Sequence, residues 1–461
     1  MTTLQTSAGT SVRTVWSPSM WALLAVLAGN MLIDALEVSV LIVALPAIGA
    51  DLALPVTSAQ WLMTGFALGF GGLMLFAGRV VALLGRRRVY LLALLAFALA
   101  SLAAGFLDSP GLLLVTRVVK GFCAALTAPT GLSIITTAFR EGADRNRAVS
   151  VYTFFGACGF TAGLVLSGLL TPVDWHWVLA FPAPVVLVLF AAGLRLVPAD
   201  PPSAAGPRHY DLPGAAALSG ALLTLVYAVV HVPEQGWGDA RVVAAFAGTV
   251  VLGVCFVLAE RSAPEPLIPV GLLANAAMIR SALAAAALNG SHLGLLLILS
   301  YRTQHDLGWG PLRTACAFLP AGAPLVVTAL LSGRLVARFG APRLVAAGLL
   351  LPTAGYAWYQ WGPHPTSYAT GMLPALLLVG AGFVLAFAAL NLQATAEVPA
   401  AGRGAAGAVY QTAVQTGALV TLSVVAAVMA GGGPAAGLVA AVGGGGFLVA
   451  LTGLRRRAGR G

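Results

Sequence analysis

Apolar stretches long enough to cross a lipid bilayer recur along almost the whole chain. A helix needs about 20 mainly apolar residues to cross the hydrocarbon core. Such stretches are expected at 21–45, 58–78, 89–107, 111–134, 148–171, 177–197, 212–232, 240–259, 281–301, 314–334, 342–361, 370–391, 405–430 and 434–454. A mean hydropathy of +0.92, with 59% hydrophobic and 9% charged residues, excludes an ordinary soluble protein. We therefore predict an all-α membrane protein with about fourteen transmembrane helices.

The arginines outside these stretches predict the orientation of the chain. When the loops are assigned alternately to the two sides of the membrane, one side receives only Arg241, Arg302 and Arg313, and the other side receives the remaining loop arginines. Because positively charged loops stay in the cytoplasm, we expect a multi-pass protein of the cell membrane with both termini cytoplasmic. The net charge of +10 then faces anionic lipid headgroups, and we expect no nucleic-acid partner.

A short internal repeat divides the chain into related halves. Gly78 to Arg88 has the sequence GRVVALLGRRR, and Gly333 to Arg343 has GRLVARFGAPR, each between two predicted spans. Proline-rich linkers flank the seventh and eighth spans. We predict an N-terminal six-helix bundle at 1–198, linkers and two additional transmembrane helices at 199–275, and a C-terminal six-helix bundle at 276–461. Two such bundles around a central cavity are typical of a large class of transporters.

Several motifs follow the order of one transporter family. The loop after the second span carries Gly78, Gly85, Arg86, Arg87 and Arg88, the fourth span contains RVVKGFCAA, and the loop after the seventh span is HVPEQGWGD. With these motifs the chain resembles the major facilitator superfamily, in particular the fourteen-span drug:proton antiporter family of bacterial multidrug and antibiotic exporters. The resemblance implies that the glycines and arginines of the loop form a cytoplasmic gate; the alternative is that the arginines only anchor the loop in the cytoplasm.

The chain departs from the family pattern at three places. Ala82 stands where the gate loop of the family has an acid, and Lys120 stands where an amide is usual. The fifth-span motif is GLVLSG from Gly163 to Gly168, without the proline and one glycine of the family. The remaining small residues of this span also serve close helix packing.

Four charged residues lie inside the predicted spans. The resemblance gives the family position of the first-span acid to Glu37, nine residues before Pro46, so Asp34 is an additional acid. Because residues three apart share a helix face and lipid exposure of charge is costly, both acids are expected to face the cavity. For two antiparallel helices, the residue numbers place Glu37 level with Arg117 and Asp34 level with Lys120. We predict proton exchange at Glu37 tuned by Arg117, with Asp34 and Lys120 as a second, more permanent pair; the alternative is a static ion-pair network.

Further polar and aromatic residues at mid-span depth are candidates for the substrate cavity. They can bind a ligand or simply a neighbouring helix. The candidates are Asn30, Trp61, Phe66, Tyr152, Phe154, Asn289, His292, Gln411 and Gln415. His292 has a side chain type that titrates near physiological pH.

The sequence lacks the motifs of an energy-coupling enzyme. It contains no phosphate-binding loop, and its four cysteines lie in separate apolar stretches without metal-ligand spacing. We expect no enzyme activity, cofactor or metal. The predicted function is a monomeric secondary transporter that exports a small amphipathic drug or antibiotic in exchange for protons. The alternatives are an uptake symporter or facilitator of a narrow substrate, and a non-transporting membrane sensor.

Overall fold

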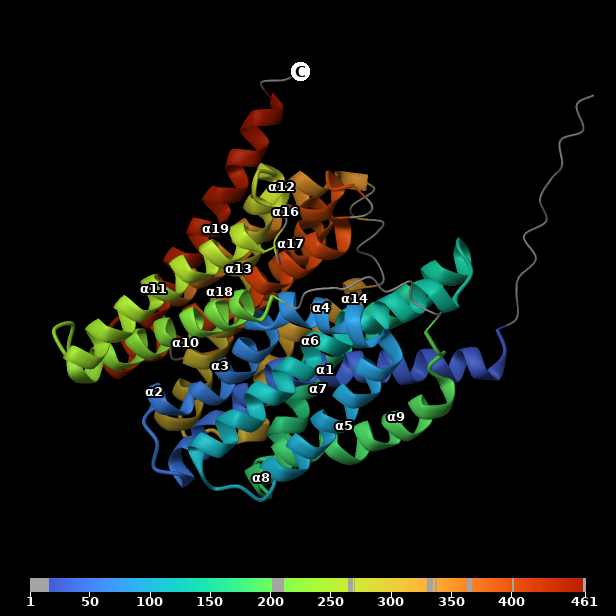
Figure 1. Cartoon of the computed structure of the whole chain (residues 1–461). Coiled ribbons are helices and arrows are strands. Elements are labelled where there is room, and N and C mark those ends of the chain that lie inside the picture. The colour runs from blue at the N-terminus through green and yellow to red at the C-terminus, as the bar shows by residue number, and fades with distance from the viewer. Residues whose placement is uncertain are drawn as a thin grey trace, which may run out of the picture.

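The fold is built from helices, several of them broken (Figure 1). It is given by a computed structural model that describes residues 16–200, 211–263, 268, 270–329, 335, 338–362, 367–399 and 402–458. Residues 16–200 contain α1 (Pro18–Asp51), α2 (Val56–Ala59), α3 (Trp61–Ala67), η1 (Leu68–Gly72), α4 (Met74–Leu84), α5 (Arg86–Ala104), α6 (Pro110–Ala138), α7 (Ala143–Leu170), α8 (Trp175–Ala180) and α9 (Pro182–Leu196). Then follow α10 (Leu212–Gln235) and α11 (Ala240–Ser262).

The rest of the chain contains α12 (Val270–Leu273), α13 (Ala276–Tyr301), η2 (Arg302–Asp306), α14 (Pro311–Ala329), α16 (Ala341–Trp361), η3 (Tyr368–Met372), α17 (Leu373–Ala396), α18 (Arg403–Ala430) and α19 (Ala435–Ala458). Local capping explains where some of these helices begin. Ser17 Oγ accepts a hydrogen bond from Met20 N ahead of α1, and Asn275 Oδ1 accepts from Ala277 N and Met278 N ahead of α13.

The number of membrane-spanning helices is lower than predicted. Within the described residues, eleven helices have the length and hydropathy of a span, or twelve if the segments Val56–Gly72 and Met74–Leu84, which meet at 51°, form one broken span. α14 and α16 coincide with the other two predicted spans but are not among these helices. The all-helical membrane fold is confirmed, and the count of fourteen spans is not.

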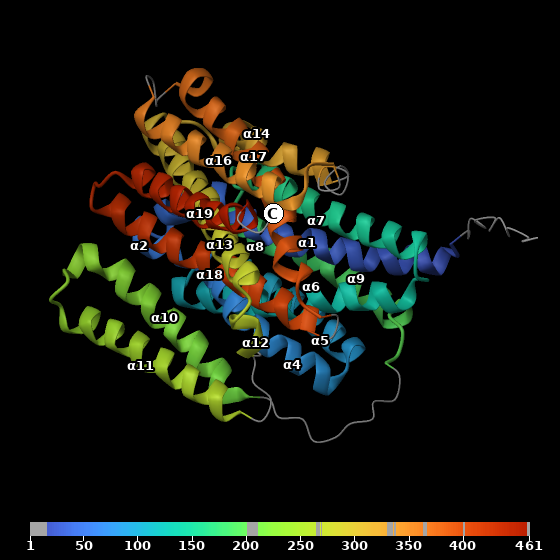
Figure 2. The same cartoon turned by 90° about the horizontal axis from the view of Figure 1, so that it is seen from above.

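Long helices pack in pairs; α1–α7 and α13–α18 run parallel and join segments distant in sequence, whereas α16–α17 is antiparallel. α10 and α11 pack on each other at one margin of the bundle, where α10 contacts α18 (Figures 1 and 2). The boundaries of the two predicted six-helix bundles, at 198 and 276, stay a prediction.

The hydrophobic core is shared at one end of the molecule and largely divided at the other. One cluster joins residues 36–48 of α1 with residues 293–299 of α13 and parts of α14, α17 and α18. At this end Gln304 Nε2 also donates to the carbonyl of Val43, at 3.0 Å. Toward the end where α1 and α13 begin, the early and the late helices have largely separate clusters. Leu75 and Phe76 of α4 join the later cluster, and Ala408 of α18 packs against the earlier one. The molecule is therefore closed at the end opposite to the starts of α1 and α13.

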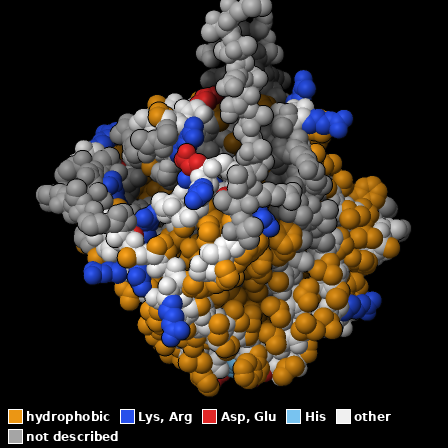
Figure 3. Space-filling view, turned by 90° about the vertical axis from the view of Figure 1, so that its right-hand side faces the viewer, with side chains coloured by type: hydrophobic (Ala, Val, Ile, Leu, Met, Phe, Trp, Pro, Cys, Tyr) orange, Lys and Arg blue, Asp and Glu red, His pale blue; other side chains and the backbone are white. Residues whose placement is uncertain are grey.

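The surface has the distribution expected for a protein embedded in lipid. Large apolar side chains such as Leu92, Val188 and Val250 are exposed by 60%, 67% and 66%. Figure 3 shows basic side chains scattered over the end of the molecule that faces the viewer, beside a wide hydrophobic surface. Charged groups thus lie where headgroups can bind them, and apolar groups lie where acyl chains can.

Candidate functional site

Four buried charged side chains meet between α1 and α6. Asp34 and Glu37 lie one helical turn apart on α1, and Arg117 and Lys120 lie one turn apart on α6. Each is exposed by 3% or less. Both helices are otherwise apolar over most of their length, so the four charges face one another rather than lipid.

Glu37 binds both cations. Lys120 Nζ lies 2.6 Å from Glu37 Oε1, and Arg117 Nη1 forms an ion pair with Glu37 Oε2. Arg117 also donates from Nη2 to the carbonyl of Glu37 at 3.0 Å and from Nε to the carbonyl of Leu62 at 2.9 Å. The guanidinium therefore ties α1 and α3 to α6, and the predicted contact of Glu37 with Arg117 is confirmed.

Asp34 is held by neutral groups. Asn30 Nδ2 and Thr127 Oγ1 donate to Asp34 Oδ2 at 2.9 and 2.8 Å. Its other oxygen, Oδ1, is buried without a hydrogen-bond partner among the described residues. No arginine or lysine nitrogen of the described residues lies within 4.0 Å of this carboxylate. The predicted pair of Asp34 with Lys120 is wrong.

The direction of helical side chains explains this correction. Side chains lean toward the N-terminus of their own helix. On antiparallel helices, Lys120 therefore leans toward the later residues of α1, and Glu37 leans back to meet it. A count of residue numbers compares only backbone depth, so it misplaces a long lysine by about one turn.

Aromatic rings screen the two cations from lipid. The guanidinium carbon of Arg117 lies 5.0 Å from the ring centre of Phe66, and Lys120 Nζ lies 5.1 Å from that of Phe97. Such contacts add attraction for a desolvated cation. Phe66 is therefore near the charge cluster, as a cavity residue was expected to be.

The other aromatic candidates of the first spans are dispersed. Trp61 packs with an apolar cluster formed by α3, η1, α10 and α18, to which Val118 of α6 also belongs. Tyr152 is buried and donates from its hydroxyl to the carbonyl of Ala128, at 2.8 Å. Phe154 is half-buried, with its ring centre 6.3 Å from that of Phe155. These three side chains and Phe66 do not form one aromatic wall.

The candidates of the later spans are neutral and lie on α13 and α18. Asn289 Nδ2 donates to the carbonyl of Val414 at 3.2 Å, which fixes α13 to α18. Gln415 is buried against the backbone of Gly71, and Gln411 is half-buried one turn earlier. These contacts fit the packing alternative that the sequence left open.

His292 lies between rings of two other helices. Its ring centre is 5.6 Å from Phe160 of α7 and 4.8 Å from Phe383 of α17. The side chain is 3% exposed, and Nδ1 has no hydrogen-bond partner among the described residues. This residue is therefore a polar group at the junction of early and late helices.

The predicted gate loop is tied to an acid that sequence reasoning missed. Arg86 Nε donates to Asp200 Oδ1 at 3.2 Å, and Arg87 N donates to Asp200 Oδ2 at 3.0 Å. Arg86 Nη1 also donates to Ser133 and Thr137, at the end of α6. Asp200 thus supplies an acid to a loop whose family position for an acid holds Ala82. Its only sequence signal is an isolated carboxylate in the linker after the sixth predicted span.

The glycines of this loop have different surroundings. A Cβ on Gly85 would lie 2.6 Å from Asp200 Oδ2, whereas nothing lies within 4 Å of one on Gly78. Gly85 has φ +87°, and Gly340, its counterpart in the repeat, has φ +79°. Both end a loop directly before a helix in a conformation that favours glycine. Arg88 is exposed, and Gly333 and Arg334 of the repeat lie outside the described residues.

Small residues of α7 allow close contact with α1 and α14. A Cβ on Gly163 would lie 2.6 Å from the carbonyl oxygen of Leu36, and one on Gly168 would lie 2.5 Å from Ala315 Cβ. Ser39 Oγ donates to the carbonyl of Phe160 at 2.7 Å across the same α1–α7 contact. The fifth-span motif therefore takes part in close packing, which is one of its two interpretations.

Thr127 is the other functional candidate that sequence reasoning missed. It follows Lys120 by seven residues, so the two side chains share one face of α6. Periodic reading of polar residues in this span would have found it. Among the described residues, no cluster of three or more His, Cys, Asp or Glu side chains could hold a metal ion.

Comparison with known proteins gives the relatives of the chain. The model of the Major Facilitator Superfamily matches residues 27–422. The puromycin resistance protein pur8 of Streptomyces alboniger is 37% identical over 415 residues, which are 89% of this chain and 82% of that protein. The cephamycin export protein CmcT of Amycolatopsis lactamdurans is 32% identical over 403 residues, 85% of this chain and 81% of that protein.

The fold is also that of solved transporter structures. The crystal structure of the POT family transporter PepTSo superposes with a TM-score of 0.68, covering 96% of this chain and 99% of that one, at 16% sequence identity. At this identity the likeness concerns the fold alone.

Proposed function

Because the chain belongs to the Major Facilitator Superfamily, and is thus a multi-pass membrane transporter and no enzyme, we propose that it exports a small amphipathic antibiotic in exchange for protons. The relatives named for puromycin resistance and cephamycin export support export of an antibiotic. The cytoplasm is the proposed source of the substrate and the cell membrane the proposed location.

The buried charge cluster is the observation that carries the proton coupling. With Asp34 and Glu37 ionised, the cluster contains two negative and two positive charges. When either acid takes up one proton, the net charge of the cluster changes by one in a medium of low dielectric constant. Such a change alters the binding of a charged substrate far more than it would in water.

Asp34 is the better proton carrier of the two acids. Glu37 forms ion pairs with two cations, whereas the partners of Asp34 among the described residues are the neutral groups of Asn30 and Thr127. Burial without a cation favours the neutral form of a carboxylate, and Oδ1 of Asp34 is free of other partners among the described residues. The proposal therefore assigns proton exchange to Asp34, and a structural role with Arg117 and Lys120 to Glu37.

The division of the core supports a rocking mechanism. The shared cluster closes one end, and separate clusters leave the other end able to part. With the termini in the cytoplasm, as the arginines predict, the closed end is the extracellular end. This conformation would therefore open toward the cytoplasm. Two six-helix units would rock against each other, each protein acting as a monomer. A reporter enzyme active only in the cytoplasm, fused after residue 461, would be inactive if this orientation were wrong.

Transport by purified protein in liposomes tests the coupling. We expect a pH gradient to drive accumulation of puromycin by the wild type and by Glu141→Gln, a control at an acid whose side chain is 85% exposed. Asp34→Asn should still exchange labelled for unlabelled puromycin but lose the response to the gradient. Gradient-driven accumulation that survives in Asp34→Asn would overturn the role of Asp34.

Growth of a sensitive host tests the direction and the substrate. Expression should raise tolerance to puromycin or to a cephamycin, and a protonophore should abolish the gain. A host made more sensitive would point to uptake, the main alternative. Tolerance that is unchanged by the protonophore would point to a carrier without proton coupling.

A further inference from the structure

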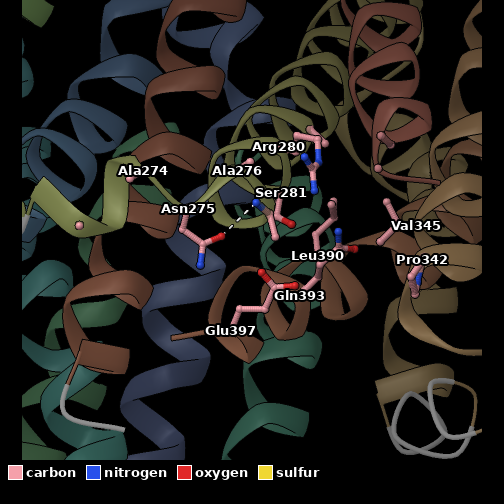
Figure 4. A pocket seen from close by; sticks show the side chains of 15 residues that line it. Ala274, Asn275, Ala276, Arg280, Ser281, Pro342, Val345, Leu390, Gln393 and Glu397 are labelled. Atoms are coloured by element: carbon pink, nitrogen blue, oxygen red, sulfur yellow. Dashed lines mark hydrogen bonds between the residues drawn. The ribbon is translucent and has the colours of Figure 1, made fainter. Parts of the chain in front are cut away.

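A polar cavity lies away from the charge cluster, where α13 and α16 begin and α17 and α19 end (Figure 4). Its volume is about 670 Å³. Arg280 and Ser281 of α13 and Gln393 and Glu397 at the end of α17 line it with polar groups, and Val345, Leu390 and Ala450 add apolar surface. It lies among the later helices only.

Three side chains of this cavity have buried polar atoms without a hydrogen-bond partner among the described residues. Ser281 is 1% exposed, yet its Oγ has no hydrogen-bond partner among the described residues. The same holds for Arg280 Nε and for Gln393 Oε1. Buried polar atoms in native proteins are almost always paired, so three of them around one cavity indicate a polar ligand.

The charges of the cavity are separated. Arg280 has no carboxylate within 4.0 Å among the described residues, and its guanidinium lies beside Gly453, where a Cβ would be 3.3 Å from Nε. Glu397 lies at the opposite margin (Figure 4). The N-terminus of α13 adds a positive dipole near Arg280. A ligand that carries both an anionic and a cationic group can contact Arg280 with the first and Glu397 with the second.

The same end of the early helices is filled. There the aromatic rings of Trp16 and Phe139 pack at 5.0 Å between centres, and Tyr90 is fully buried beside them. Around the cavity, Ala274, Ala277 and Gly453 leave the corresponding space open. Small residues therefore help to form this cavity.

We propose that this cavity binds the headgroup of an aminophospholipid. Arg280 and Ser281 hold the phosphate, since a guanidinium and a hydroxyl are strong donors to phosphate oxygens. Glu397 accepts hydrogen bonds from the primary ammonium. Helix ends surround the cavity, which places it at the depth of the headgroups, and Val345, Leu390 and Ala450 lie where the upper acyl chain would contact the protein.

Native mass spectrometry of the delipidated full-length protein tests this site. Phosphatidylethanolamine is titrated against phosphatidylglycerol, which has the phosphate but no amine, and against soluble glycerophosphoethanolamine. We expect one tightly bound phosphatidylethanolamine, and Arg280→Gln should weaken it about tenfold, as expected for loss of a charge-assisted contact. Glu397→Gln should remove the preference over phosphatidylglycerol.

Arg261→Gln is the matched control, because Arg261 is an exposed arginine in the last turn of α11 and does not line the cavity. Its lipid binding should equal that of the wild type. Thermal unfolding without lipid will verify that the variants fold. Undiminished binding by Arg280→Gln would overturn the proposal, and equal affinity for soluble glycerophosphoethanolamine would replace the lipid by a soluble ligand of the same chemistry.

Discussion

The central helices of the early and late parts of the chain have similar packing and different chemistry. Gly163 of α7 contacts the backbone of α1, and Gly417 of α18 contacts the backbone of α13, so each pair approaches as closely as the other. Yet α1 and α6 bury Asp34, Glu37, Arg117 and Lys120, whereas α13 and α18 bury only neutral polar groups such as Asn289, Ser291 and Gln415.

This difference separates the contacts that stabilise the fold from the side chains that can change their charge. Close contacts between small residues are present in both parts and need no buried charge. Burying charges in one part has a desolvation cost, which ion pairs offset only where their geometry is good. In the function that we propose, the proton chemistry lies in the early helices and the late helices offer neutral surface to the substrate.

Loss of Glu37 should have the largest effect. Glu37→Gln leaves the cations of Arg117 and Lys120 buried without their carboxylate, which lowers the free energy of unfolding by about 3–5 kcal/mol. The measurement is thermal unfolding of the purified protein in detergent. Adding Lys120→Met to Glu37→Gln should recover part of the loss. If Asn289→Ala in the late helices costs as much, the charged and neutral parts do not differ in the way proposed.

Alanine at the close contacts should cost similar amounts in both parts. Gly163→Ala places a Cβ 2.6 Å from the oxygen of Leu36, and Gly417→Ala places one 2.5 Å from Ala286 Cα. Each should lower the free energy of unfolding by about 1–3 kcal/mol, since the helices must move apart. Gly445→Ala, with nothing within 4 Å, is the control and should be neutral. An effect confined to Gly163 would show that only the α1–α7 contact is critical.

The sequence predicted the helices better than it predicted the partners of the charges. The length of the apolar stretches predicted the long helices that the structure describes. The contact between Glu37 of α1 and Arg117 of α6 was also predicted correctly. Lys120 was assigned to the wrong acid because side-chain direction shifts a contact by a turn. The partner of Arg86 was missed because Asp200 lies 114 residues away, and such distant contacts have no local pattern.

Removal of the His292 ring should weaken substrate binding without affecting proton coupling. The ring lies between Phe160 and Phe383, so His292→Ala removes aromatic contact area at the junction of early and late helices. We expect KM for puromycin transport to rise about fivefold, in line with the energy of aromatic contacts. The ratio of transport with and without a pH gradient should stay that of the wild type. A lost gradient response would extend the coupling into the late helices.

Substitution of an exposed acid in the early part of the chain should have the smallest effect on stability. Its comparison with Glu37→Gln shows whether burial of an acid or its place in the early helices sets the loss. The backbone N–H of His176 donates to Asp174 at 2.9 Å and its ring nitrogen Nδ1 lies 2.7 Å away, which lowers the pKa of Asp174 below its ordinary value of 3.8. A lowered pKa stabilises the fold above the unfolded value, and this contribution is lost as the pH falls through the folded value. Because the side chain is 48% exposed, Asp174→Asn should lower Tm by only a few degrees at pH 6 and by less at pH 3. A loss at pH 6 as large as that of Glu37→Gln would mean that charge in the early helices, and not its burial, sets the cost.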